Sequence, residues 1–300
     1  MKKRTTKTNL KGKEVKMMKK ILFMVLVAAM LTIGTTAHAF WVGQVWNETD
    51  GWVNNIMGLD WSSSGSGNAE NLGPIGTPVV IGTPFTFRYQ AFLVGFTNPV
   101  GDPVNVTQTA TTGLNKDYQF TVVALIPEVV ANVIGPVGLF SSLPGGLFYV
   151  YYDTTPNTVV STGFGFDDGV LVASGAIPAG QISSFTVTSA TTGIGSTVLE
   201  GLVNYANPLY LNPAITIMDF RFEGTLNIPP LDSTTAAFFS GRGVEGNFST
   251  FTVGADDLPF KVDGSSKFSV PEPSTILLLG IGLLGLAGLA RRRSLKKELK

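Results

Sequence analysis

The chain contains no cysteine, and its only histidine, His38, lies near the N-terminus. Without cysteine there is no disulfide framework, so the fold must be stabilised by its apolar core. From Phe40 onward the chain has neither imidazole nor thiol groups, which excludes Ser-His-Asp and Cys-His nucleophilic catalysis and zinc sites with the usual ligands. We therefore expect no enzymatic activity and no cofactor.

Positive charge is also scarce in the central part of the chain. Between Phe40 and Val270 there are 6 Lys and Arg against 18 Asp and Glu, a net charge of −12. The basic residues gather instead at the two ends, before Phe40 and after Ala290. Such an acidic body repels nucleic acid and anionic lipid, so we expect no nucleic-acid partner. It also favours contact with divalent cations and with an acidic polymer matrix that they bridge.

The N-terminal segment has the composition of a signal peptide. Lysines precede the apolar stretch Ile21–Ile33, and Ala37, His38 and Ala39 form a small-x-small cleavage pattern. Residues 1–39 are therefore the predicted signal peptide, and the mature chain begins at Phe40. The candidate start residues are Met1, Met17 and Met18.

Three features follow one another at the C-terminus. A short polar motif comes first and comprises Val270, Pro271, Glu272, Pro273 and Ser274. It precedes the apolar run Ile276–Ala290, which would form a helix of about 22 Å at about 1.5 Å per residue. The last feature is a basic cluster of Arg291, Arg292 and Arg293. A permanent membrane span needs about 20 residues, so this single transmembrane helix suits a temporary anchor. An anchor that is never cut is the alternative.

This order of motif, apolar run and basic cluster resembles the PEP-CTERM sorting tail. The resemblance implies recognition and cleavage at residues 270–274 by an exosortase-type membrane protease of a Gram-negative bacterium that makes exopolysaccharide. The arginine cluster would act as the stop-transfer element on the cytoplasmic side. The protein would then be exported through the inner membrane, anchored there transiently, and released to the cell surface or extracellular matrix.

Between the two ends the sequence predicts strands. Apolar and polar residues alternate with period two, as in half-buried strands, and Gly, Pro, Asn and Asp clusters separate the segments. The predicted strands are Phe85–Leu93, Tyr118–Ile126, Leu147–Tyr152, Val170–Ala173, Ser184–Val187, Ile215–Phe222 and Phe248–Val253. This pattern favours an all-β body, an antiparallel β-sandwich or a jelly roll.

The sequence divides into four predicted parts. They are the signal peptide (1–39), a β-rich extracytoplasmic domain (40–264), a polar linker (265–269) and the sorting tail (270–300). The alternative is a body split near residues 141–146.

Three blocks of the body are similar to blocks in PEP-CTERM proteins tied to flocculation. They are Tyr151–Pro156, Gly165–Gly169 and Phe220–Gly224. The resemblance implies a non-enzymatic role in cell aggregation through exopolysaccharide, as in flocs and biofilms.

All the tryptophans lie close together at the start of the mature chain: Trp41, Trp46, Trp52 and Trp61. Indole faces can stack on sugar rings, so these residues are candidate glycan contacts. The alternative is that they fill the core, where large aromatic side chains contribute much burial. The Trp41–Trp61 region also carries the second functional hypothesis, an envelope protein that binds or cleaves carbohydrate, since glycoside cleavage needs only two carboxylates.

Acidic side chains flank a glycine-rich stretch in the middle of the body. Asp153, Asp167 and Asp168 are the candidate Ca²⁺ ligands, since oxygen-rich loops can hold this ion. The spacing matches no known calcium loop, and Asp-Asp-Gly is also typical of a plain hairpin turn.

Overall fold

The computed structural model describes residues 38–40, 42–73, 77–98, 113–189, 192–227, 237–238 and 251–271. Ala39–Val270 form one compact unit. The predicted signal peptide up to Ala37, and the tail from Glu272 onward, lie outside the described residues. Within the described part of the chain there is no helix long and apolar enough to cross a membrane.

The described secondary structure consists of strands. In the first half of the chain they are β1 (His38–Phe40), β2 (Gly43–Asn47), β3 (Gly51–Ile56), β4 (Gly58–Glu70), β5 (Pro84–Thr97), β6 (Gln119–Ile134), β7 (Val137–Ser142) and β8 (Gly146–Asp153). In the second half they are β9 (Val170–Ile177), β10 (Ile182–Ser189), β11 (Thr192–Ala206), β12 (Leu211–Asn212), β13 (Ile217–Asn227), β14 (Ala237–Phe238), β15 (Phe251–Thr252) and β16 (Leu258–Pro271). The all-β class predicted from the sequence is confirmed.

Most strands belong to one 11-stranded sheet that closes on itself. Its hydrogen bonds run from β4 through β5, β6, β7, β10, β11, β13 and β16 and return to β4, each pair antiparallel. Closure leaves no unpaired edge along this circuit, and an exposed edge is where sheets pair with other chains.

Two long strands, β6 and β11, each pair with two different strands along the same edge. β6 pairs with β8 over residues 119–125 and with β7 over residues 128–134. β11 pairs with β10 over residues 192–197 and with β9 over residues 202–206. The pair β7–β10 therefore bridges the layers at one end of these strands, and the pair β8–β9 bridges them at the other.

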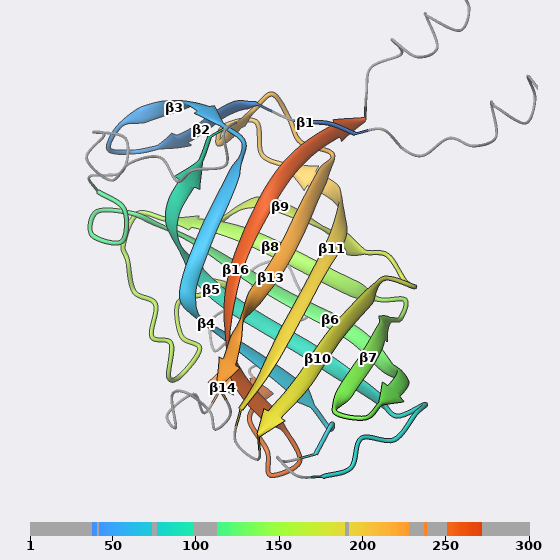
Figure 1. The fold of residues 1–300 in the computed structure, drawn as a ribbon. Coiled ribbons are helices and arrows are strands. Elements are labelled where there is room, and N and C mark those ends of the chain that lie inside the picture. The colour runs from blue at the N-terminus through green and yellow to red at the C-terminus, as the bar shows by residue number, and fades with distance from the viewer. Residues whose placement is uncertain are drawn as a thin grey trace, which may run out of the picture. The chain divides into compact units, whose positions relative to one another are not determined.

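Figure 1 shows the resulting two layers, with β11, β13 and β16 crossing in front of β5, β6, β8 and β9. One apolar core lies between them and contains the large buried side chains Trp61, Tyr89, Phe96, Phe120, Phe148 and Phe220. The inward face of β6 follows the period-two pattern of its sequence, since Phe120, Val122, Ala124, Ile126 and Val130 are all buried there. The layered antiparallel arrangement is thus built by the alternation read from the sequence.

Two smaller sheets accompany the large one. Strands β12, β2 and β3 form one of them and β14 and β15 the other. The β2–β3 hairpin is tied to the main sheet where the backbone N–H of Glu48 donates a hydrogen bond to the Tyr152 hydroxyl over 2.8 Å. The segment before the first long strand is therefore folded onto the body.

The structure corrects the predicted linker. Residues 265–269 lie inside β16, where they pair with β13 on one side and, up to Lys267, with β4 on the other. Ser266 and Ser269 are buried, and Phe268 belongs to the core. Side chains of a strand project from the faces of the sheet, and short hydroxyl side chains are small enough to be buried there, so a polar segment can still form a central strand.

Candidate functional site

The predicted sorting residues are divided by the limit of the described chain. Val270 and Pro271 end strand β16. Glu272, Pro273 and Ser274 lie outside the described residues, as do Arg291, Arg292 and Arg293. At the other end, Ala39 and Phe40 lie in β1, whereas Ala37 lies outside the description. The structure therefore places the first two residues of the sorting motif at the end of the last strand of the body.

Trp61 belongs to the core and offers no face to a glycan. Its side chain is fully buried, and its Nε1–H donates a hydrogen bond to Ser266 Oγ over 3.1 Å. Buried indole groups need such a partner for their N–H. For this residue the structure corrects the expectation of a glycan contact.

Trp46 joins an aromatic cluster beneath the β2–β3 hairpin. Its ring meets Tyr152 edge-on with centroids 5.9 Å apart, and Tyr210 at 5.5 Å. Tyr152 also packs on Phe120 at 4.9 Å and on Tyr118 at 5.8 Å. Such pairs contribute about 0.5–1.5 kcal/mol each beyond the burial of area. The cluster therefore attaches the hairpin to the main sheet.

Trp52 is the one predicted tryptophan whose described side chain is substantially exposed, at 39%. It pairs across the hairpin with Trp46. Trp41 lies outside the described residues. A single exposed indole beside a half-buried one is a smaller platform than the sequence suggested.

The three candidate calcium ligands lie at the two ends of the loop between β8 and β9. Asp153 Oδ1 accepts a hydrogen bond from the Thr155 backbone N–H over 2.8 Å. Asp168 Oδ2 accepts one from Asn157 Nδ2 over 3.0 Å. Both contacts are internal to the loop, and among the described residues no group of three or more acidic or histidine side chains is placed to hold a metal ion.

Asp167 is fully buried, and within the described part of the chain no other side chain or backbone group is hydrogen-bonded to its carboxylate oxygens. Burial, and secondarily the neighbouring Asp168, raises its pKa to about 6. The adjacent Phe166 explains this position. Its ring packs on Val123 and Tyr151 of the outer sheet face, and its carbonyl accepts a hydrogen bond from Thr121 Oγ1 over 2.8 Å. These contacts fix the loop against the outer face of the sheet, and Asp167 is buried because it follows Phe166 in the loop.

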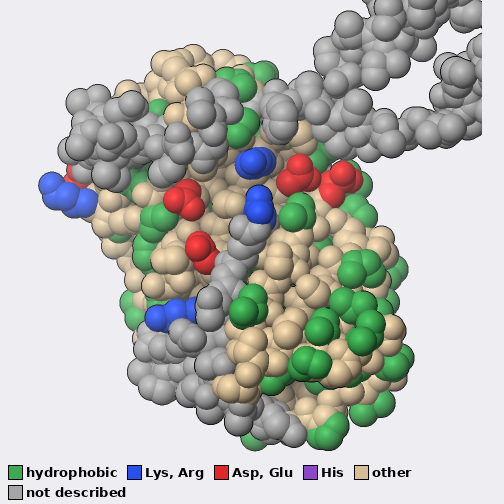
Figure 2. Space-filling model, in the orientation of Figure 1, with side chains coloured by type: hydrophobic (Ala, Val, Ile, Leu, Met, Phe, Trp, Pro, Cys, Tyr) green, Lys and Arg blue, Asp and Glu red, His purple; other side chains and the backbone are tan. Residues whose placement is uncertain are grey.

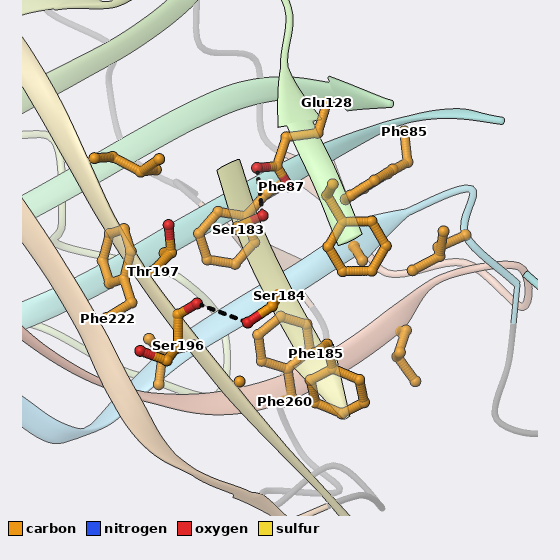
Figure 3. A pocket seen from close by; sticks show the side chains of 17 residues that line it. Phe85, Phe87, Glu128, Ser183, Ser184, Phe185, Ser196, Thr197, Phe222 and Phe260 are labelled. Carbon is orange, nitrogen blue, oxygen red and sulfur yellow. Dashed lines mark hydrogen bonds between the residues drawn. The ribbon is translucent and has the colours of Figure 1, made fainter. Parts of the chain in front are cut away.

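A cavity of about 90 Å³ lies inside the closed sheet, at the end bridged by β7 and β10. Phenylalanine side chains make up much of its wall: Phe85, Phe87, Phe140, Phe185, Phe222 and Phe260. Some of these rings contact one another, with centroids 5.2 Å apart for Phe85 and Phe140 and 5.6 Å for Phe87 and Phe222. Figure 3 shows the rings around the space and the polar side chains on one wall.

One acidic side chain, Glu128, faces this apolar space. It is 4% exposed, and its Oε1 accepts a hydrogen bond from Ser183 Oγ over 3.0 Å (Figure 3). Burial raises its pKa from 4.5 to about 7, and the hydrogen bond from Ser183 opposes part of that rise. Perturbed acids in apolar pockets are typical of functional sites, although structural groups share the property.

The sequence contains a signal for Glu128 that lies outside the recognised motifs. It is the only charged residue in the apolar strand Gln119–Ile134. An isolated acid at an inward position of such a strand is unusual, since charged side chains are rarely buried without a partner. Ser183 has no comparable signal, because its own strand β10 also contains Ser184 and Ser189.

The described chain is thus an all-β body with an acid-bearing apolar cavity, followed at once by a short polar motif. Residues 269–293 match the family model of the PEP-CTERM protein-sorting motif. No curated protein and no solved structure matches the chain. The protein therefore carries a PEP-CTERM sorting signal, which implies export, processing by an exosortase, and membrane-associated sorting toward the cell surface.

Proposed function

We propose that this protein is a non-enzymatic component of the cell surface or extracellular matrix that promotes exopolysaccharide-associated aggregation of cells. The observation that carries the proposal is the PEP-CTERM motif at residues 269–293. Cleavage near Pro271–Pro273 would free a body that ends with β16, the strand in which the motif begins.

The surface of the body supports an adhesive role. Its net charge of −12 between Phe40 and Val270 suits divalent cations as bridges to acidic polysaccharide. Figure 2 shows few charged side chains on one face and a gathering of hydrophobic ones over β7, β10 and β11. Ile182, Ile194 and Val198 are each at least half exposed there. Exposed apolar patches of this kind are typical of interaction surfaces.

The flocculation-like blocks also gain a structural context. Tyr151–Asp153 ends β8, and Gly165–Gly169 ends the loop that returns to β9. The two blocks touch, because a side chain at Gly169 would lie 2.5 Å from the Tyr152 carbonyl oxygen. We propose that these two blocks recur in the flocculation-associated subgroup because together they form this packed corner.

The sorting step is tested by changing Pro271, Glu272 and Pro273 together to alanine. We expect the natural chain to end near Pro273 and to appear outside the inner membrane, and the variant to stay uncut in the membrane fraction. Intact mass and cell fractionation measure both results. A wild-type chain that remains full-length in the membrane would make this an anchored domain and remove the support for a matrix role.

The aggregation step needs a separate measurement. Purified exopolysaccharide should retain the protein, and a chelator should release it if divalent cations form the bridge. The alternative function, carbohydrate binding or cleavage through the Trp41–Trp61 region, is favoured by the exposed Trp52. Trp52→Ala would then abolish retention, and release of reducing sugars would identify cleavage. Retention that survives both the chelator and Trp52→Ala would point to the apolar face over β10 and β11.

A further inference from the structure

The cavity at the β7–β10 end has the composition of a small-molecule site. Its lining is mostly aromatic and aliphatic, with a few polar groups gathered on one side, as in typical ligand pockets. Its volume of about 90 Å³ is well above the roughly 10–15 Å³ that one water requires, and an apolar cavity of about 150 Å³ binds benzene. The space is smaller than that cavity and suits a short alkyl chain.

We infer that this cavity binds a small neutral molecule that has an apolar body and one hydroxyl or carbonyl oxygen, which accepts a hydrogen bond from Glu128. The apolar body would lie against the phenylalanine rings. This inference is independent of the proposed adhesive function, because the cavity is inside the sheet and the adhesive contacts are outside it.

The polar end of the ligand is assigned from the hydrogen bonds of Glu128. Oε1 accepts the Ser183 hydroxyl proton, so a proton carried by this carboxyl group would lie on Oε2. A protonated carboxyl group donates one hydrogen bond. Leaving a buried polar group unpaired is costly, so a ligand oxygen that accepts this proton would be stabilised at this wall.

The neutrality of the ligand follows from the same wall. Among the described residues that line the cavity, Glu128 is the only acid or base, so a charged ligand would lack a fixed counter-charge when Glu128 is protonated. A ligand that displaces water from the cavity disfavours the carboxylate further. It should therefore bind the protonated form. With a pKa of about 7, its affinity should be nearly constant below pH 6 and about tenfold weaker at pH 8.

The test uses 1-hexanol as the probe and the full chain, purified in the mature form that cells accumulate. Methyl NMR signals of Leu199, Leu258 and Val262, which line the cavity, should shift saturably with hexanol. Methyl groups of Val53, which lies outside the lining, should not shift. Hexanoate and hexylammonium, which carry the same chain with a charge, should bind at least tenfold more weakly at pH 6.

Two variants separate a ligand site from a packing defect. Ala69→Leu adds bulk to the lining and should abolish the hexanol shifts while the spectrum stays folded. Glu128→Gln keeps a neutral hydrogen-bonding group and should bind hexanol with the same affinity at pH 6 and pH 8. The inference is overturned if hexanol gives no saturable shift in the natural protein, or if affinity does not change with pH when Glu128 is present. A natural protein that prefers hexylammonium would also overturn it, since the ionised acid would then be the binding form.

Discussion

Replacing Glu128 with glutamine should change how the stability of the protein depends on pH. Below about pH 4 this carboxyl group is protonated in both the folded and unfolded chains, so it adds no pH dependence there. As the pH rises from 4.5 to about 7, the unfolded chain loses the proton while the buried group keeps it. The free energy of unfolding of the natural protein therefore falls across this window, because the folded state binds more protons.

The size of the effect follows from the pKa. The interval from 4.5 to about 7, at about 1.4 kcal/mol per pH unit, corresponds to roughly 3 kcal/mol. Glutamine stays neutral at every pH. The difference in unfolding free energy, Glu128→Gln minus natural protein, should thus increase by about 3 kcal/mol between pH 4 and pH 8. Asp167 and the other acids are the same in both proteins, so their contributions cancel in this difference.

Urea unfolding at several pH values, followed by tryptophan fluorescence, measures this difference. Ser183→Ala is the matched variant, because it removes the hydrogen bond that lowers the pKa of Glu128. The stability of Ser183→Ala should therefore continue to fall to a higher pH than that of the natural protein. If the difference between Glu128→Gln and the natural protein is the same at pH 4 and pH 8, Glu128 is not a buried, neutral acid and the reasoning fails.

Three further substitutions, the last with a matched control, test the packing of the body. Asp167→Asn should stabilise the protein increasingly as the pH rises from 3.8 to about 6, because the unfolded chain loses the Asp167 proton in this window while the buried group keeps it; urea unfolding at pH 3 and pH 8 should show the gain only at the higher pH. Trp61→Phe should cost about 1–3 kcal/mol, because it leaves the buried Ser266 hydroxyl without its donor; a chemical unfolding midpoint equal to that of the natural protein would contradict this. Gly67→Ala should cost about 1–3 kcal/mol, because the new methyl would lie 2.5 Å from Val262 Cγ2, whereas Gly254→Ala, with 3.4 Å to its nearest atom, should leave the thermal midpoint nearly unchanged.

Strands with strong alternation were predictable from the sequence. Phe85–Leu93 falls within β5, and Tyr118–Ile126 matches the start of β6 except for Tyr118, which precedes the strand. The inward positions of both strands carry the aromatic and branched residues that the pattern required. The same holds for the predicted strand Leu147–Tyr152 within β8. In these segments the local pattern and the tertiary burial agree, so periodicity is sufficient.

Strands β4 and β16 were not predictable by the same reasoning. β4 has the sequence GLDWSSSGSGNAE, which has the composition of a loop, yet most of it is buried. It can be buried because its glycines leave room for side chains of the neighbouring strand: Gly67 lies against Phe260 and Val262 of β16. Whether β4 forms a buried strand therefore depends on the side chains of β16, and the reverse is also true. Because the two strands are far apart in the sequence, no short segment contains this information.

The candidate sites show the same limit. The sorting motif could be identified because its features are contiguous in the sequence and match the family model. The tryptophans are also close together in the sequence, but the fold places them in different environments. Trp61 is a core residue, whereas Trp46 and Trp52 pair across a hairpin. Glu128 and Ser183 are 55 positions apart, and only the pairing of β7 with both β6 and β10 brings them together.

The cavity is best understood from the glycine and phenylalanine content of the chain. Glycine usually weakens a strand, because it has no side chain to pack. Here several strand glycines lie under aromatic rings: Gly193 under Phe185, Gly138 under Phe140, and Gly67 under Phe260. The same three rings line the cavity. Because each ring rests on a glycine, its position depends on the absence of a side chain beneath it. The volume that faces Glu128 is therefore set by glycines outside the cavity wall, and a methyl group at any of them would displace a ring that lines it.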